Sequence, residues 1–243
     1  MTDAMEVELA AIRAWPAADD QQIGNWLVRR DRGYTKRANA IYAWAGDNPR
    51  SLDWHLTESH RLLDEADLPI ILRETSFAPA AGLADALRGQ GMTAFDHTLV
   101  LTRALDGTND TDPAPATDLE TWMHLYETFE GGTKGNQAIH REILERIAGQ
   151  RLLAVHETEG RPVSIGLAVA DGSLLGLFDI ATGQAERGKG HGRKLVTGML
   201  AWGRAAGCTT AYLQVMATNT AAVRLYERLG FTEAYRYHYW AQR

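Results

Sequence analysis

One short glycine-rich segment constrains the fold of this chain more than any other feature. The segment 187–192 reads RGKGHG, follows an apolar run from Leu174 to Thr182, and precedes an amphipathic run from Leu195 to Ala206. This pattern predicts a strand, a tight turn and the start of a helix in succession. Glycines let such a turn curl so that several N–H groups point into one concavity, and the helix N-terminus adds a partial positive charge. The segment is therefore predicted to bind a phosphate group.

Two common nucleotide-binding motifs do not fit this segment. Residues 183–190 spell G-x-x-x-x-G-K-G, with Gly190 where a Walker A motif requires the hydroxyl that binds magnesium. Gly188, Gly190 and Gly192 alternate, so the G-x-G-x-x-G spacing of a dinucleotide-binding strand–turn–helix is also absent. ATP hydrolysis and a Rossmann fold are therefore not expected.

The composition narrows the class of protein. The formal net charge is −6, whereas nucleic-acid-binding domains usually carry a basic excess. The single cysteine, Cys208, excludes an internal disulfide and a cysteine-based metal site. Residues 1–8 lack the apolar core of a secretion signal, and the apolar runs are far shorter than a membrane span. We therefore expect a cytoplasmic protein with no metal and with neither nucleic-acid nor membrane partners.

A composition break divides the chain. Residues 106–118 read DGTNDTDPAPATD, which is typical of a linker because it offers almost nothing to bury. We therefore predict domains at residues 1–105 and 118–243, joined by a linker at 106–117. The fold class expected is α/β, with a mixed α+β sheet in the second domain.

Hydrophobic periodicity and turn residues predict the elements of both halves. In the second half the expected order is α-α-β-β-β-α-β-α-β, with helices from Asp118, at about 136–149, at 195–206 and at 219–229, and strands at 152–156, 163–170, 174–182, 211–216 and 231–240. In the less regular first half, strands are expected at 26–32, 37–44, 69–73 and 93–103, and helices at 52–66 and 80–89.

A second motif follows the glycine segment after one strand. Residues 219–231 read NTAAVRLYERLGF. The pattern Arg187-x-x-Gly190-x-Gly192 resembles the pyrophosphate loop of the GNAT N-acetyltransferase family, and 219–231 resembles that family's other core motif, N-x-x-A-x-x-x-Y-x-x-x-G-F. The motifs occur in the family's order with a strand between them. The resemblance covers residues 118–243 and implies an acyl-CoA N-acyltransferase fold.

A weak internal repeat extends this resemblance to the whole chain. Residues 87–93 (LRGQGMT) match 226–232 (YERLGFT) as a helix end, a glycine and a strand start. Such junctions are common, so chance and duplication are both open. The layout resembles tandem-GNAT proteins with a degenerate N-terminal copy, because position 87 is Leu rather than Tyr and the first half has no glycine cradle. One acetyl-CoA per chain is therefore expected.

The resemblance implies that acetyl-CoA is the co-substrate. Its pyrophosphate would bind the backbone of 187–193, and its pantetheine arm would add to the strand at 180–182. One backbone N–H of that strand would stabilise the oxyanion. Lys189 and Arg193 are either electrostatic helpers or solvated surface cations, and Asn219 either contacts the cofactor or only caps its helix. The cofactor-binding residues implied are Ile180, Ala181, Thr182, Arg187, Gly188, Lys189, Gly190, His191, Gly192, Arg193 and Asn219.

The family pattern assigns an acid but leaves the base open. Tyr226 matches the general acid that protonates the departing thiolate; the alternative is a buried structural tyrosine. In family members that acetylate protein N-termini, a strand glutamate acts as base, and Gln214 stands at that position. Asp179 is the nearest alternative carboxylate in sequence, facing away from the Ile180 side chain by strand alternation. Asp179 and Tyr226 are therefore the candidate catalytic residues, and a water chain is the other route for the proton.

The function implied is acetyl transfer, directly and without an acyl-enzyme, to the amine of a small molecule that is amino-acid-like or another metabolite. The alternatives are acetylation of a protein or peptide amine, against which Gln214 argues, and a non-catalytic acyl-CoA sensor. The sequence carries no indication of oligomeric state. The basic cluster Arg29, Arg30, Arg32, Lys36 and Arg37 is either the solvated face of a hairpin or a site for an anionic substrate or for the 3′-phosphate of the cofactor.

Overall fold

The computed structural model describes residues 3–47, 50–106, 111–130 and 134–242. Its first part contains α1 (Ala4–Ala14), β1 (Asp19–Ile23), β2 (Trp26–Arg30), the 3-10 helix η1 (Lys36–Ala38), β3 (Ile41–Ala43), α2 (Leu52–Glu65), β4 (Leu72–Thr75), α3 (Leu83–Gly89) and β5 (Thr93–Ala104). Its second part contains α4 (Leu119–Glu130), α5 (Lys134–Arg146), β6 (Gln150–Thr158), β7 (Arg161–Asp171), β8 (Leu174–Thr182), the 3-10 helix η2 (Gln184–Glu186), α6 (His191–Ala205), β9 (Thr210–Met216), α7 (Thr220–Arg228) and β10 (Thr232–Ala241).

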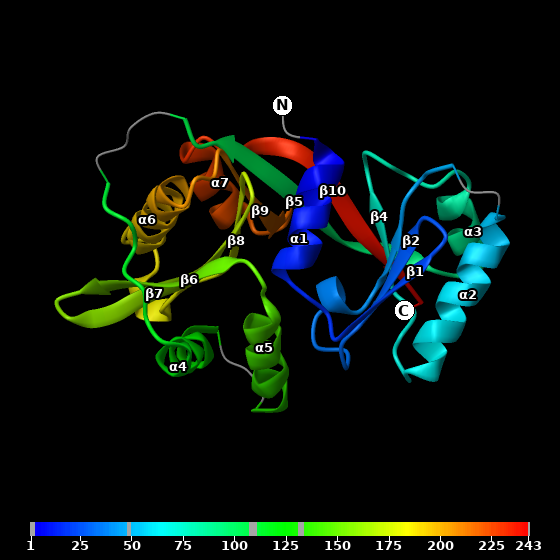
Figure 1. Cartoon of the computed structure of the whole chain (residues 1–243), viewed down its shortest axis with the longest axis horizontal. Helices are drawn as coiled ribbons and strands as arrows, with labels where there is room; N and C mark the ends of the chain where they lie inside the picture. Colours follow the sequence, from blue (N-terminus) through cyan, green and yellow to red (C-terminus); the bar gives the residue numbers. More distant parts are fainter. Residues whose placement is uncertain (1–2, 48–49, 107–110, 131–133, 243) are drawn as a thin grey trace.

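The strands form one large mixed sheet. The ten described strands lie in the order β1-β2-β3-β4-β10-β5-β9-β8-β7-β6 (Figure 1). The pairs β3–β4 and β8–β9 are parallel, and the other neighbours are antiparallel. The predicted α/β class with a mixed sheet is confirmed. Within the described residues, no helix combines the length and the apolarity needed to cross a membrane.

The second half follows the expected order of elements. Asp118 begins α4, because its Oδ1 accepts a hydrogen bond from the Thr121 N–H at 2.9 Å. The strand β8 has the predicted bounds, and the helices differ from prediction by a few residues at their ends. Periodicity was informative here because these elements are long and bury one face or both.

The first half departs from prediction in several places. The helix α1 and the edge strand β1 were not expected. Strand β1 reads DDQQI and is largely exposed, so it lacks the apolar alternation that marks a strand. The expected strand at 37–44 is instead the 3-10 helix η1 followed by the short strand β3, and β4 begins three residues later than expected. The strand expected at 26–32 ends at Arg30.

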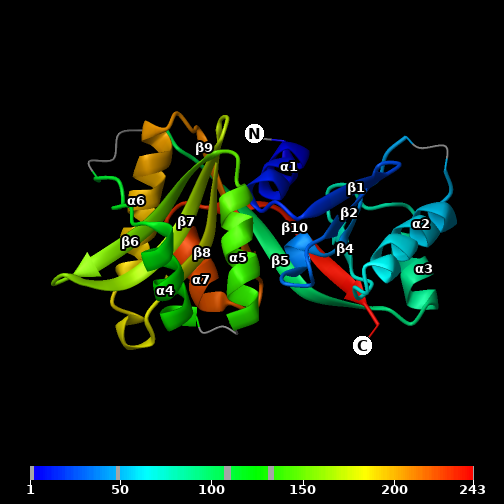
Figure 2. The same cartoon turned by 60° about the horizontal axis from the view of Figure 1, so that its bottom comes forward.

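Helices cover both faces of the sheet (Figure 2). Successive residues of β6 alternate between two cores: Leu153 and Val155 belong to the cluster under α1, α4 and α5, whereas Leu152 and Ala154 belong to the cluster under α6 and α7. A third cluster lies between α2, α3 and the strands β1 to β4. The first cluster contains residues of both halves, so the two halves share a core.

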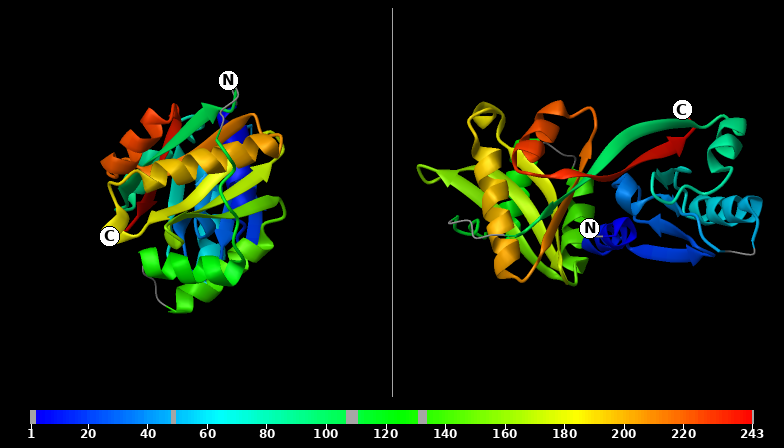
Figure 3. Two further views of the ribbon diagram at one scale, coloured as in Figure 1. Left: turned by 90° about the vertical axis from the view of Figure 1, so that its left-hand side faces the viewer. Right: turned by 90° about the horizontal axis from the view of Figure 1, so that it is seen from above.

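The two halves exchange their last strands. Strand β10, the end of the chain, pairs with β4 of the first half, and β5, the last strand of the first half, pairs with β9 of the second. Between them β5 and β10 pair with each other, and the two long strands run side by side through the middle of the molecule (Figure 3). The sheet is therefore continuous from one half to the other.

The junctions that lead into these two strands have matching geometry. Gly91 and Gly230 both have positive φ, at 78° and 80°. The N–H of Met92 donates to the carbonyl of Leu87, and the N–H of Phe231 donates to the carbonyl of Tyr226, each at 3.0 Å. Both are the six-to-one bond of a Schellman helix end. The sequence repeat thus corresponds to a repeated structural junction.

The division into domains at 1–105 and 118–243 stays a prediction. Of its predicted linker, 107–110 lies outside the described residues. The part that follows is docked on the second half, since the Ala114 N–H donates to the carbonyl of Gly198 and the Thr117 N–H donates to that of Leu153. These residues therefore pack against α6 and β6.

Candidate active site

A cavity opens where β8 and β9 separate. The two parallel strands pair from Leu174 and Thr210 up to Leu177 and Leu213, and beyond this point they have no register partners in each other. A cavity of about 680 Å³ lies there. The ends of β8 and β9, helix α7, the segment before and within η1, and the strands β5 and β10 all line it. The backbone edge of β8 is therefore free to pair with an extended ligand.

A bulge in β8 shapes this cavity. Asp179 and Ile180 lie opposite the single residue Gly166 of β7, and Asp179 has a φ of 48°. Phe178 and Asp179 consequently lie on the same side, facing α1 and α5, whereas Ile180 packs toward α6 with the second core. Asp179 does face away from the Ile180 side chain, as strand alternation predicted. Beyond the bulge, Ala181 and Thr182 pair with β7 and lead into the glycine segment.

The glycine segment forms a concave turn ahead of α6. Gly188 and Gly190 have φ values of 79° and 87°, a region that side chains with a Cβ rarely adopt, and Gly190 is the N-cap of α6. Within the described chain, no hydrogen bond occupies the N–H groups of residues 188–193. Gly192 lies against Thr182, because a Cβ there would approach the threonine hydroxyl to 3.4 Å. The segment fits a phosphate group by its backbone.

Three side chains of the segment make contacts outside the turn or with its flanks. The Arg187 Nε donates to the Thr182 carbonyl at 3.2 Å, and Lys189 pairs with Glu186 at 3.0 Å. His191 is buried, with its Nδ1 3.2 Å from the Nε2 of His156. Arg193 is exposed at the start of α6. Any anion in the turn would therefore meet backbone N–H groups first.

Helix α7 brings two predicted residues to the cavity. Asn219 is its N-cap, accepting from the Ala222 N–H at 3.2 Å through its Oδ1, so its side-chain NH₂ remains available. Tyr226 is 7% exposed and lines the cavity. Its hydroxyl makes no hydrogen bond with the described residues, and burial raises the pKa of Tyr226 to about 12. The phenol therefore keeps its proton and can donate it.

Gln214 lines the same cavity from β9. The Tyr237 hydroxyl donates to its Oε1 at 2.9 Å. An amide held in this way can orient a ligand but cannot accept a proton as a base. The position to which the GNAT resemblance would assign a base therefore holds a non-basic side chain that is engaged by Tyr237.

Asp179 has a buried partner that the sequence did not reveal. Its Oδ2 lies 2.9 Å from the Nε2 of His140 on α5, and both side chains are more than nine-tenths buried. The His140 ring packs among four aromatic rings, those of Trp15, Tyr34, Trp122 and Tyr126. Burial, together with the negative charge of Asp179, raises the pKa of Tyr34 to about 12. The Asp179–His140 pair therefore lies in largely aromatic surroundings beside the cavity.

A signal for His140 was present in the chain. It sits three and four residues before Ile143 and Leu144, on the apolar stripe of α5, where a polar residue needs a partner. The partner belongs to β8, 39 residues away, and no local pattern indicates that pairing.

The basic cluster of the first half separates in the structure. Arg29 is fully buried, donating to the carboxylate of Asp20 and to the carbonyls of Ile12, Trp15 and Arg37. Its interpretation as part of a solvated hairpin face is therefore wrong. Arg30 and Arg32 make ion pairs at the surface. Only Lys36 and Arg37 line the cavity.

Comparisons with known proteins find relatives along almost the whole chain. A family model described as "Probable histone acetyltransferase Rv0428c C-terminal" matches residues 2–240. A Bacillus subtilis protein, "Uncharacterized N-acetyltransferase YobR", is 28% identical over 248 residues, which cover 98% of each chain.

Two solved structures share the fold along most of the chain. A GCN5-related N-acetyltransferase from Kribbella flavida is similar with a TM-score of 0.72 at 17% identity, covering 99% of this chain and 96% of its own. A tandem GNAT protein from the clavulanic acid biosynthesis pathway has a TM-score of 0.59 at 14% identity, covering 96% and 86%. At these identities, the two likenesses concern the fold alone.

Proposed function

Because the chain belongs to the GNAT family of N-acetyltransferases, we propose that it moves an acetyl group from acetyl-CoA directly to the amine of a small, amino-acid-like molecule. One observation carries this proposal. The cavity at the end of the β8–β9 pairing is bordered by a free strand edge, by the candidate acid Tyr226 and by residues of the first half. A thioester and an amine could meet there from opposite sides.

The residues present fit acetyl-CoA. The unoccupied N–H groups of 188–193 would hold the pyrophosphate, supported by the partial positive charge of the α6 N-terminus. The backbone of Ile180 and Thr182 would pair with the pantetheine arm, and the side-chain NH₂ of Asn219 would donate to it. When bound, acetyl-CoA supplies the activated acetyl group as a thioester.

The chain's own groups would move two protons. A backbone N–H in the β8 bulge would donate to the thioester oxygen as negative charge develops on it. The amine nitrogen forms the new bond to the acetyl carbon while the carbon–sulfur bond breaks. Asp179 would take the proton that the amine loses, and Tyr226 would give a proton to the leaving sulfur. His140 acts through Asp179 as a positioning residue.

The position of Cys208 supports transfer of the acetyl group directly to the amine, without an acetyl-cysteine intermediate. Cys208 is buried, with its Sγ 3.4 Å from the carbonyl of Leu174, at the end of β8 opposite the cavity. Burial raises the pKa of its thiol, which disfavours the nucleophilic thiolate. It is thus unsuited to carry an acetyl group.

A small acceptor is supported by the walls of the cavity. Residues 33–37 of the first half line the cavity together with Tyr226 and Gln214. A volume of about 680 Å³ is in the range of small-molecule sites, about 300–1,000 Å³. The non-basic Gln214 argues against acetylation of protein N-termini.

A thiol-release screen tests the proposed function. Acetyl-CoA is incubated with the full chain and a panel of amines, amino acids and short peptides, and acetyl-CoA binding is measured by calorimetry. Release of thiol that depends on a small amine supports the proposal. Release with peptides alone would point to a protein substrate, and tight binding without release for any amine would indicate a sensor.

A further inference from the structure

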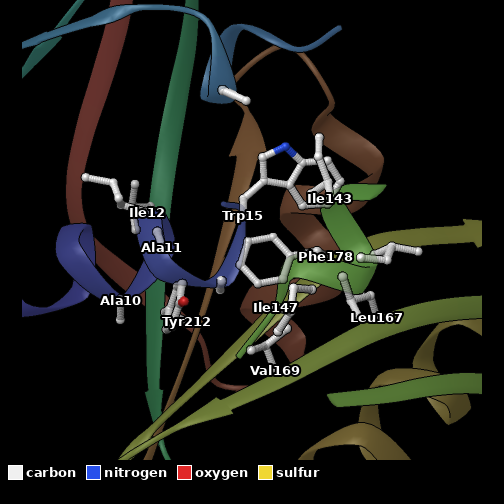
Figure 4. Packing of buried hydrophobic residues seen from close by; sticks show 14 of the residues in the cluster. Ala10, Ala11, Ile12, Trp15, Ile143, Ile147, Leu167, Val169, Phe178 and Tyr212 are labelled. Carbon is white, nitrogen blue, oxygen red and sulfur yellow. The ribbon is translucent and has the colours of Figure 1, made fainter. Parts of the chain in front are cut away.

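Arg37 lines the cavity and packs against two aromatic rings. Its guanidinium stacks on Trp15, with 4.2 Å from the guanidinium carbon to the ring centroid, and lies 5.6 Å from the ring of Phe178. Figure 4 shows these two rings side by side, next to Ile143 and Ile147 of the shared core. The side chain is 25% exposed, and the residue lines the cavity. A stacked guanidinium loses little conformational freedom when it binds a ligand.

The donors of Arg37 are uncommitted. Arg29, Arg30, Arg32 and Arg73 all donate hydrogen bonds through their guanidinium groups, whereas none joins that of Arg37 to any group in the described part of the chain. The closest carboxylate oxygen, Oδ1 of Asp179, is 3.9 Å away, which is too long for a hydrogen bond. The half-buried guanidinium of Arg37 therefore lines the cavity in a long ion pair with Asp179 and with no hydrogen-bond partner among the described residues.

The charges around Arg37 come in opposite pairs. Asp179 uses Oδ2 for His140 and leaves Oδ1 toward Arg37. Lys36 is paired with Asp96 at 2.9 Å. The formal charges of the Lys, Arg, Asp and Glu residues lining the cavity therefore cancel. A neutral zwitterion preserves this balance, whereas a phosphate ester would add negative charge that nothing there offsets.

We propose that Arg37 and Asp179 recognise the acceptor as an α-amino acid, Arg37 binding its carboxylate and Asp179 its ammonium group. This inference rests on the proposed function and names its substrate class. The two ends of an α-amino acid lie a few ångströms apart, as do the two side chains. Arg37 matches a carboxylate through two parallel hydrogen bonds. The ammonium group must lose one proton to solvent before it can react, and Asp179 is then in place to take the second proton, which the nitrogen loses as the new bond forms.

A matched acceptor series tests this assignment. The twenty common L-amino acids are assayed for thiol release with acetyl-CoA, beside the amides of the same amino acids, the corresponding decarboxylated amines and glycyl dipeptides. The wild-type chain should prefer the free amino acid over its amide by about 10- to 100-fold in kcat/KM, the range expected for loss of a charge-assisted bidentate contact.

The variant Arg37→Gln should remove that preference. Its KM for the amino acid should rise about 10- to 100-fold, while the KM for the amide and the affinity for acetyl-CoA by calorimetry stay within about threefold. Arg32→Gln is the matched control, because Arg32 belongs to the same basic segment but pairs with Glu142 at the surface and does not line the cavity. It should leave all these constants unchanged.

The outcomes separate the two proposals. Equal use of acids, amides and amines by the wild-type chain, or an equal loss for acid and amide in Arg37→Gln, overturns the amino-acid assignment and leaves acetyl transfer to amines standing. Absence of thiol release with every acceptor overturns the proposed function, and the assignment with it. A preference for glycyl dipeptides over amino acids also contradicts it, since their carboxylate is remote from the amine.

Discussion

Among single residues, Tyr226 is the proposed general acid that protonates the leaving thiolate, and its role can be tested by one substitution. Replacing Tyr226 by Phe removes the proton donor and keeps the ring that packs against Phe231. We expect kcat to fall about 100-fold, at the low end for loss of a general acid. The dissociation constant of acetyl-CoA, measured by calorimetry, should stay within about twofold.

The pH dependence of this variant follows from the raised pKa of Tyr226. A folded-state pKa of about 12, above the ordinary value of 10.0, keeps the hydroxyl protonated throughout the range in which activity is measured. The ratio of wild-type to Tyr226→Phe kcat should therefore be constant from about pH 6 to 10. A ratio that declines near pH 8 would contradict both the pKa and the assignment. The raised pKa of Tyr226 also makes the free energy of unfolding depend on pH. Its contribution to stability is fully present below about pH 10 and is lost as the pH rises through about 12, where the buried hydroxyl ionises.

The buried ion pair between Glu8 and Arg73 is expected to contribute to the free energy of unfolding. The carboxylate of Glu8 on α1 accepts from the Nε and Nη2 of Arg73 on β4, at 2.8 and 2.6 Å, and from the hydroxyl of Tyr235 on β10. Glu8 and Arg73 are almost completely buried. Glu8→Ala should lower the free energy of unfolding by about 3–5 kcal/mol, because it leaves the guanidinium buried without its counter-charge.

Urea denaturation of a double-mutant cycle checks this expectation. The pair Glu8→Leu with Arg73→Met should be less destabilised than the sum of the two single variants, since it leaves no lone charge. Additive losses would show that the two residues do not depend on each other.

At the scale of elements, the glycine turn before α6 makes a prediction with an internal control. Gly190→Ala forces a Cβ into a backbone with φ of 87°, which costs about 1–2 kcal/mol and moves the N–H groups of the turn. Gly207→Ala, at the other end of α6, meets the same strain at φ of 89°, and no atom lies within 4 Å of the added Cβ at either site.

Calorimetry and urea denaturation separate the two variants. Both should lose similar stability, but only Gly190→Ala should weaken acetyl-CoA binding, by about tenfold, the equivalent of 1.4 kcal/mol. Equal affinity in the two variants would mean that the turn does not hold the pyrophosphate.

Some helices and strands can be predicted from the sequence alone, and others cannot. Periodicity predicted strand β8 and the order of elements in the second half. Buried strands and amphipathic helices show their burial in the pattern of their own apolar residues. Strand β1, with four polar residues of five, carries no such mark. The GNAT resemblance singled out Tyr226 and the glycine turn from local motifs. The basic cluster included Arg37 as part of a possible anion site but did not distinguish it from Arg29, Arg30 and Arg32. His140 contacts Asp179, and Arg37 lines the cavity, because elements far apart in the chain pack together, which local patterns do not encode.

At the scale of the whole molecule, the exchanged strands predict how the halves depend on each other. Residues 1–105 produced alone would lack β10 beside β4, and residues 118–243 would lack β5 beside β9. We expect each fragment alone to be insoluble or unfolded by circular dichroism. Co-expressed, the two should copurify with thiol-release activity. Independent folding of both fragments would contradict the shared sheet and support autonomous domains.

The order in which the chain is synthesised gives the strand exchange a further consequence. Strand β4 acquires its antiparallel neighbour only when residues 237–240 have been made, more than 160 positions later. Until then the nascent first half presents an open strand edge, a template for pairing with other chains. The first half therefore cannot complete its sheet on the ribosome ahead of the second. The shared sheet is therefore complete only when β10 is available to pair with β4.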